Sequence, residues 1–196
     1  MPRALTEQEK CRQCKKLIEK GMPIVLSQGI RKVSIEGITK AAGMSKGSFY
    51  HHFESKEKFM IEVIMSLHRQ IFTLAEQMLS SGGILQENAR GFLLNLFDMP
   101  EMAFFTKYYD EINELAESLA EYELQFAEEA EVNMYEKLLI ALGIDTRKAH
   151  PGVVHNLMHT MYMIMQSDLM IQEHLPKTKE ILTESLLSYI FGGVTK

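Results

Sequence analysis

The sequence lacks the features that mark disulfide-stabilised and membrane-spanning proteins. Among its 196 residues are only two cysteines, Cys11 and Cys14, which are too few for a disulfide framework. No stretch approaches the roughly 18 apolar residues that a membrane-spanning helix needs. Residues 1–7 contain no apolar signal-peptide core. We therefore expect a cytoplasmic protein with no membrane partner.

Proline and glycine are also scarce, at 5 and 12 residues. No segment alternates polar and apolar residues as a half-buried strand does, whereas apolar residues recur at helical spacing. The pattern predicts an all-α fold of about nine helices. These cover residues 7–28, 35–42, 46–52, 56–80, 85–97, 101–107, 108–142, 151–172 and 176–191.

Two residues set the shape of the first predicted helix. Gly29 follows it directly and is a suitable C-terminal stop. Pro23 lies inside it, where proline lacks the N–H of a helical hydrogen bond and crowds the carbonyl of Glu19. The sequence therefore predicts a local kink at Pro23 rather than a break.

Charge is distributed unevenly along the chain, although the net charge is −5. Residues 1–60 contain 12 Lys and Arg against 6 Asp and Glu, whereas residues 61–196 contain 9 against 20. A basic end on an acidic body is expected when only that end meets nucleic-acid phosphate. Chance segregation of surface charge is the alternative reading.

The chain contains none of the common catalytic signatures, such as a phosphate-binding Walker loop, a dinucleotide-binding glycine turn or a nucleophile elbow. We expect no enzymatic activity and no cofactor. Two pairs leave a metal or redox role open, namely Cys11 with Cys14 and His155 with His159. Neither pair has an evident further ligand, so a structural interpretation is favoured and no metal site is predicted.

The segment from Ser34 to Phe53 is the most informative part of the sequence. Ser34 and Ser45 are good N-caps for two short helices, and Gly43 ends the first of them. A short helix, a glycine turn and a second short helix form the helix-turn-helix layout of DNA-binding proteins. Apolar side chains such as Phe49 and Phe53 suit the buried face.

The remaining positions of the second short helix suit a DNA surface. Lys46 supplies positive charge, Ser45 and Ser48 supply hydroxyls, and Tyr50 supplies a phenol. Gly47 costs a helix about 1 kcal/mol relative to alanine. This cost is tolerable where the backbone must approach a groove or phosphate closely.

Residues 38–57 read Ile-Thr-Lys-Ala-Ala-Gly-Met-Ser-Lys-Gly-Ser-Phe-Tyr-His-His-Phe-Glu-Ser-Lys-Glu. This run resembles the signature of the TetR family (tetracycline-repressor-like regulators), and detailed similarity extends over about residues 15–65. The resemblance implies a helix-turn-helix DNA-binding domain at residues 1–54 and a helical ligand-binding and dimerisation domain at residues 55–196. Pro23 departs from the family pattern, which puts only the straightness of the first helix in doubt.

The resemblance also implies roles for individual residues. Ser45, Tyr50 and Lys56 correspond to contacts with backbone phosphate. The positions in or beside the major groove would be Lys46, Gly47, Ser48, His51 and His52. For His52, packing inside the domain is an equal alternative, and for Phe49 and Phe53 a core position is favoured.

A homodimer is the next implication, formed by packing the last two helices against their copies. Their apolar stripes fit this arrangement, although they fit a monomer core as well. The stripes contain Leu157, Met158, Met161, Ile164, Met165 and Leu169 on one helix, and Ile181, Leu182, Leu186, Leu187, Ile190 and Phe191 on the other.

The resemblance further implies a small-molecule ligand, apolar or cationic, bound among the middle helices. Fourteen methionines would suit an adaptable pocket, although any one of them is more often core than ligand wall. Candidate lining residues are Phe72, Met102, Phe105, Tyr108, Tyr109, Phe126, Met134, Tyr135, His159 and Met163.

The sequence thus predicts a DNA-binding transcriptional regulator, a repressor that a ligand releases from a palindromic operator. Three alternatives remain open. One is a regulator or architectural protein with no ligand, the second is an activator, and the third is an enzyme with a DNA-binding head.

Overall fold

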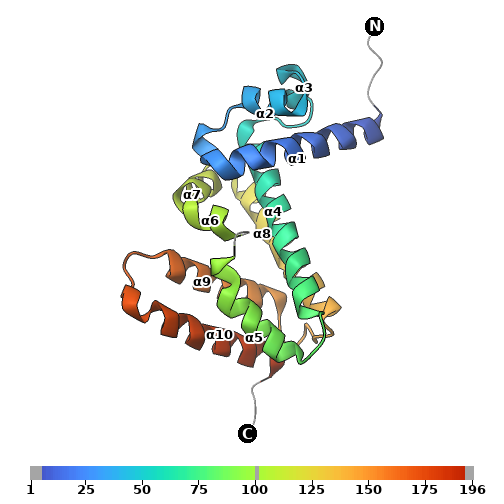
Figure 1. The fold of residues 1–196 in the computed structure, drawn as a ribbon. Coiled ribbons are helices and arrows are strands. Elements are labelled where there is room, and N and C mark those ends of the chain that lie inside the picture. Colours follow the sequence, from blue (N-terminus) through green and yellow to red (C-terminus); the bar gives the residue numbers. More distant parts are fainter. Residues whose placement is uncertain (1–5, 100–101, 193–196) are drawn as a thin grey trace. The chain divides into compact units, whose positions relative to one another are not determined.

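The structure is a computed structural model that describes residues 6–99 and 102–192, without the side chains of residues 121 and 122. All regular structure in these ranges is helical, which confirms the predicted all-α fold (Figure 1). The elements are α1 (Glu7–Lys32), α2 (Ile35–Ala42), α3 (Lys46–Tyr50), α4 (Lys56–Leu79), α5 (Leu85–Asn95), η1 (Leu96–Asp98), α6 (Ala103–Lys107), α7 (Tyr109–Glu117), α8 (Glu121–Ala141), α9 (Pro151–Gln166), η3 (Gln172–His174) and α10 (Leu175–Phe191).

The chain folds into two compact units. The first contains Met1–Ser66 and Tyr108–Ser118, and the second contains Leu67–Lys107 and Leu119–Lys196. The first unit is therefore larger than the N-terminal domain predicted at residues 1–54. It also includes the first turns of α4 and the whole of α7.

The first unit is built around the crossing of α1 with α2 and the start of α4. Leu17, Ile38, Phe49 and Phe59 are completely buried there. The ring centroids of Phe49 and Phe59 lie 5.5 Å apart, in the range of favourable aromatic packing. Phe53 packs on both rings, at 5.3 and 5.1 Å. Phe49 and Phe53 thus belong to the core, as their apolar character predicted.

The bend in α1 lies at Gly29 rather than at Pro23. Gly29 is the residue of this helix with non-helical backbone angles, φ 79° and ψ −179°. Only glycine adopts this region without strain. Pro23 keeps helical angles, so the predicted kink is displaced to the glycine, and a last short turn continues from Ile30 to Lys32.

The second unit has its core among α5, α9 and α10, which lie side by side (Figure 1). Leu93 of α5, Met161 of α9 and Leu186 and Leu187 of α10 are buried in one apolar cluster. Tyr135 and Leu139 bring α8 against the same cluster. This unit thus buries one face of each of its long helices.

Two helix boundaries differ from the prediction. The expected helix 108–142 is divided into α7 and α8, because Ala120 adopts an extended conformation and its N–H donates to the Glu123 carboxylate at 3.1 Å. The helix expected to reach residue 172 ends at Gln166, where Ser167 is extended and its hydroxyl accepts from the N–H of Leu169. The predicted start of a helix at Glu101 lies outside the described residues.

None of the helices in the described part of the chain is long and apolar enough to span a lipid bilayer.

Candidate nucleic-acid interface

Helices α2 and α3 form a helix-turn-helix whose caps agree with the sequence prediction. The Ser34 hydroxyl accepts from the Gly37 N–H at 3.1 Å, and the Ser45 hydroxyl accepts from the Ser48 N–H at 3.0 Å. Gly43 ends α2 in the left-handed conformation, with φ 62°. A side chain with a Cβ is strained there, which explains the glycine of the turn.

Most of the predicted DNA-contacting side chains are available at the surface. Ser45, Lys46, Gly47 and His51 are exposed, and the Tyr50 side chain is 49% exposed. Ser48, His52 and Lys56 are half-buried. Because Phe49 is fully buried, α3 is anchored by one face and presents its polar face outward.

His52 is held inside the first unit by a contact with α1. Its Nε2 lies 3.0 Å from the Gln13 Oε1. Burial lowers the pKa of His52, and the neighbouring charges of His51 and Lys10 lower it further. A neutral His52 that fixes α3 to α1 agrees with the packing alternative raised from the sequence, and it leaves His51 as the outward-facing histidine of the pair.

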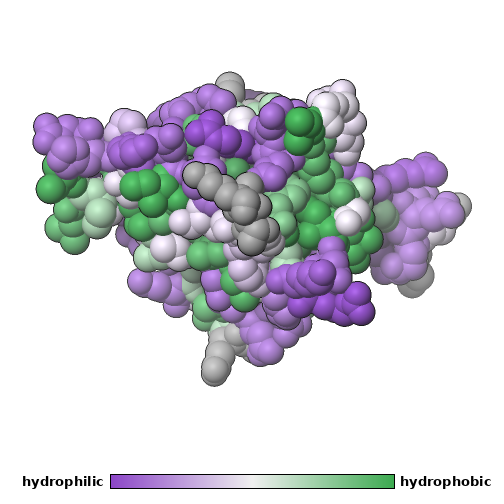
Figure 2. Space-filling view, turned by 90° about the horizontal axis from the view of Figure 1, so that it is seen from below, coloured by the Kyte–Doolittle hydropathy of each residue, from purple (hydrophilic) through white to green (hydrophobic). Residues whose placement is uncertain are grey.

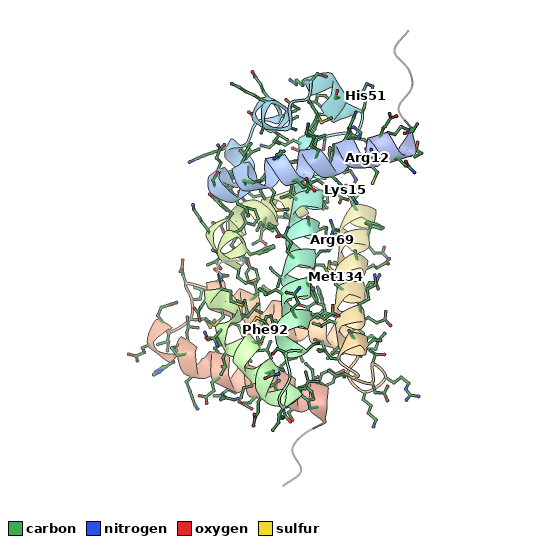
Figure 3. The ribbon with its side chains drawn as sticks, turned by 45° about the vertical axis from the view of Figure 1, so that its right-hand side comes forward. Arg12, Lys15, His51, Arg69, Phe92 and Met134 are labelled. Carbon is green, nitrogen blue, oxygen red and sulfur yellow. The ribbon has the colours of Figure 1, made fainter. Side chains whose placement is uncertain are left out.

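Basic residues of α1 extend this surface, and the sequence reasoning did not single them out. Lys10 is close enough to His52 to shift its pKa. The Lys16 ammonium lies 4.0 Å from the Cβ position that Gly43 lacks, so it is beside the turn. Figure 3 shows Arg12 and Lys15 on the same helix and His51 directly after α3. The spacing of these basic residues was the available signal.

Lys56, the predicted phosphate ligand at the start of α4, already has a partner within the unit. Its Nζ donates to the backbone carbonyl of Arg31 at 3.1 Å. This bond connects the end of α1 with the start of α4. A lysine held by a single carbonyl still has two further N–H donors for a phosphate oxygen.

The predicted ligand-binding residues are only partly brought together. Phe72, Phe105, Tyr135 and His159 belong to a cluster of aromatic and histidine side chains in the second unit. Phe72 and Tyr135 pack edge to face at 4.7 Å, and Phe105 stacks on His68 at 4.7 Å. His155 and His159 have ring centroids 6.0 Å apart. Tyr162 donates to the Phe105 carbonyl at 2.7 Å.

The other candidate ligand residues lie elsewhere. Phe126 is 72% exposed and Met163 is 48% exposed. Tyr108 and Tyr109 belong to the first unit, where the Tyr108 hydroxyl donates to the Ser27 carbonyl at 2.8 Å. Met102 packs partly buried against the second unit's core, and Met134 is half-buried on α8 (Figure 3).

A carboxylate lies at the centre of the aromatic cluster. Glu131 of α8 places its Oε1 2.8 Å from His68 Nδ1 and its Oε2 3.2 Å from His155 Nε2. Burial raises the pKa of Glu131, but the hydrogen bonds from His155 and His68 outweigh this and lower it to about 2. The bond to Glu131 also raises the pKa of His155, against the effect of burial. Nothing in the sequence distinguished Glu131 from the other acids of α8.

The two pairs for which a metal or redox role was left open are the cysteines of α1 and the histidines of α9. Both cysteines are free thiols, and burial raises the pKa of the Cys14 thiol, which makes it less reactive. His155 is engaged by Glu131 and by Asn156. Within residues 6–99 and 102–192, no group of three His, Cys, Asp or Glu side chains is arranged to hold a metal ion.

Comparisons with known proteins agree with this geometry. The family model of bacterial regulatory proteins of the tetR family matches residues 17–63. The repressor DhaR of Mycobacterium sp. (strain GP1) is 48% identical over 48 residues, which are 24% of this chain and 24% of DhaR. The repressor KstR2 of Mycobacterium tuberculosis (strain CDC 1551 / Oshkosh) is 23% identical over 187 residues, 92% of each chain. The match with DhaR thus spans about a quarter of that protein.

The fold is shared with a solved structure as well. A TetR-family regulator of Pectobacterium atrosepticum superposes with a TM-score of 0.65 at 14% identity, covering 98% of this chain and 99% of that one. The helix-turn-helix, its sequence signature and the helical body therefore agree, and residues 17–63 belong to the tetR family of bacterial regulatory proteins.

Proposed function

We propose that this protein is a sequence-specific DNA-binding transcriptional repressor. The observation that carries the proposal is the outward polar face of α3 and its C-cap. Lys46, Tyr50 and His51 are exposed there, and the buried Phe49 anchors the helix. A recognition helix must present such side chains to base edges and phosphates. The surplus of positive charge in residues 1–60 supports the same reading, because phosphate contacts dominate the affinity for DNA.

The protein acts as a homodimer in this proposal. Helix α10 exposes Ile181 at 55% and carries an open groove lined by Lys177, Glu184 and Ser188. Figure 2, seen from below, shows hydrophobic residues at the surface among hydrophilic ones. Leu186 and Leu187 are monomer core, so the dimer contact is made by the opposite face of α10. The helix-turn-helix domains of the two protomers would then reach successive major grooves about 34–36 Å apart.

A small ligand of the second unit would release the protein from its operator. The aromatic cluster around Tyr135 and Phe105 suits an apolar ligand, and the Glu131 carboxylate suits a cationic group. The ligand would bind preferentially to dimers whose two DNA-binding domains are not spaced to fit the operator. By shifting the population toward these dimers, it would lower the affinity for DNA. Equal operator affinity with and without its ligand would argue for the alternative of a regulator that responds to no small molecule.

The decisive experiment is selection from random duplex DNA, followed by salt-titrated binding of wild type and of the double variant Tyr50→Ala/Lys56→Ala. We expect an inverted repeat bound by two chains. The double variant should bind at least about tenfold more weakly, because it can no longer form two of the hydrogen bonds to phosphate. The slope of its salt dependence should fall by about one unit for each lysine that no longer binds phosphate.

Lys137→Ala is the matched control, since it removes an exposed lysine of α8 in the second unit. It should leave both affinity and salt slope unchanged. If no sequence is enriched, the helix-turn-helix does not bind a specific DNA sequence. If the double variant binds like wild type, Tyr50 and Lys56 do not contact the DNA.

A further inference from the structure

A segment that interrupts the second unit in sequence is bound within the first. The chain enters the first unit at Tyr108 and leaves it after Ser118, and residues on both sides belong to the second unit. Segment 108–118 has no sequence neighbour in the first unit. It is therefore held there by its non-covalent contacts, which are made to the end of α1.

The central contact is a carboxylate that binds backbone amides. Glu111 Oε2 accepts from the N–H of Ile30 at 2.6 Å and from the N–H of Arg31 at 2.9 Å. Gly29 turns the chain out of the helix just before them, which leaves these two donors without partners in α1. A charged acceptor of two backbone donors makes a stronger contact than a neutral one.

Gly29 leaves room for this contact. A Cβ at this position would lie 2.6 Å from a ring carbon of Tyr108 and 2.8 Å from Glu111 Oε2. The Tyr108 hydroxyl also binds the Ser27 carbonyl. The Arg31 guanidinium pairs with Glu114 at the exposed edge. The α1–α2 junction, Ser27–Ser34, is thus held from one side by three residues of a single segment.

The same junction holds a predicted DNA contact from its other side. The Arg31 residue whose N–H binds Glu111 offers its carbonyl to Lys56 Nζ. Ser34 at the end of the junction caps α2, the first helix of the helix-turn-helix. A displacement of the junction would therefore move both the start of α2 and the partner of Lys56.

We propose that Glu111 is a positioning residue for DNA binding, whose carboxylate fixes the α1–α2 junction and thereby places Lys56 and α2 for contact with phosphate. This inference rests on the proposed DNA-binding function. In this inference α7, which is remote in sequence from the helix-turn-helix, contributes to the affinity for DNA. Glu111 itself touches no DNA.

The test compares Glu111→Gln with Glu117→Gln, an exposed glutamate on the same helix, and with Glu114→Gln, which removes only the surface pair with Arg31. The first readout is hydrogen exchange at the amides of Ile30 and Arg31 in the DNA-free protein. The second is the affinity for the selected operator and its salt slope. Glu111→Gln should speed exchange at both amides and weaken binding on the order of three- to tenfold.

The salt slope of Glu111→Gln should also fall toward that of Lys56→Ala, because a misplaced Lys56 no longer reaches its phosphate. A role in stability alone would leave the slope unchanged. Glu117→Gln should match wild type, and Glu114→Gln should have a smaller effect than Glu111→Gln. Tyr108→Phe removes the hydrogen bond from this tyrosine to the junction, so it should also speed amide exchange and weaken operator binding. This second variant tests the inference if Glu111→Gln does not fold.

Unchanged exchange at Ile30 and Arg31 would show that Glu111 does not hold the junction. Faster exchange with wild-type affinity and slope would show that the junction does not position the DNA contacts. Either result overturns the inference and leaves the proposed function standing. A wild-type protein that binds no DNA would overturn both.

Discussion

At the scale of single residues, two glycines of the first unit illustrate opposite constraints. Gly21 lies inside α1, and a Cβ there would approach the tip of the Phe59 ring to 2.6 Å and Ile38 to 3.1 Å. Phe59 is completely buried beside Phe49 and Phe53, so it has no room to move. At Gly47 of α3, the nearest atom to an added Cβ is the Ser45 hydroxyl at 3.7 Å.

Gly21→Ala should therefore destabilise the protein although alanine favours helix. The gain in helix propensity is about 0.5–1 kcal/mol, whereas overpacking a filled core costs about 1–3 kcal/mol. We expect a net loss of about 1–2 kcal/mol in the free energy of unfolding, measured by urea denaturation. Gly47→Ala is the control and should be neutral or stabilising by up to about 1 kcal/mol. Equal effects of both substitutions would contradict the close approach at Gly21.

At the scale of elements, the short helix α3 depends on its N-cap. The Ser45 hydroxyl accepts from the Ser48 N–H and also lies 3.0 Å from the Ser48 hydroxyl. The same side chain is a predicted phosphate contact. This hydroxyl therefore caps the helix and would also contact DNA. Removing it would lower both stability and DNA affinity, so a Ser45→Ala variant could not separate the two roles.

Substitution by aspartate and asparagine separates these roles, because both are good N-caps but only aspartate is charged. Ser45→Asp and Ser45→Asn should each keep the unfolding free energy within about 0.5 kcal/mol of wild type. Ser45→Asp should bind operator DNA more weakly than Ser45→Asn, and the difference should grow as salt is lowered. Operator titrations at two salt concentrations test this, and identical affinities for the two variants would place Ser45 away from phosphate.

At the scale of the whole molecule, two electrostatic features stand out, one in each unit. Positive charge gathers in residues 1–60, and a half-buried carboxylate lies in the second unit between histidines of α4 and α9. Other groups facing Glu131 and His155 are His159, Tyr135 and Glu128. Burial, helped by Glu131, raises the pKa of Tyr135, which stays neutral.

This network predicts a pH-dependent stability. Glu131 has a lowered pKa, so its contribution is present above its ordinary value of 4.5 and is lost as the pH falls toward about 2. His155 has a raised pKa, so its contribution is present below 6.5 and is lost as the pH rises through the raised value. Both contributions are therefore present together between pH 4.5 and 6.5.

Glu131→Gln should lower the free energy of unfolding by about 1.5–3 kcal/mol at about pH 5–6, and by less at about pH 8–9. Thermal denaturation across this range provides the measurement. Glu136→Gln, an exposed glutamate of the same helix, is the control and should show no such dependence. A Glu131→Gln effect that is constant with pH would mean that Glu131 and His155 do not form an ion pair in the folded protein.

The sequence by itself determined the local features of this protein. Serine caps at Ser34 and Ser45, the glycine at Gly43 and the apolar period act over a few residues, so the all-α fold and the helix-turn-helix were predictable. The buried faces of Phe49 and Phe53 follow from the same period. The polar face of α3 was predicted for the same reason, since each of these features depends only on neighbours along one helix.

Only the tertiary structure decided which distant residues meet. Glu111 binds amides more than 75 positions away, with separations of 81 and 80 residues. Glu131 meets His155 across 24 residues. In the sequence, such a glutamate cannot be distinguished from one that faces solvent, because its partner is determined by how other helices pack against it. The division of 108–142 into α7 and α8 has the same cause, since residues 108–118 pack in the first unit and the longer remainder packs in the second.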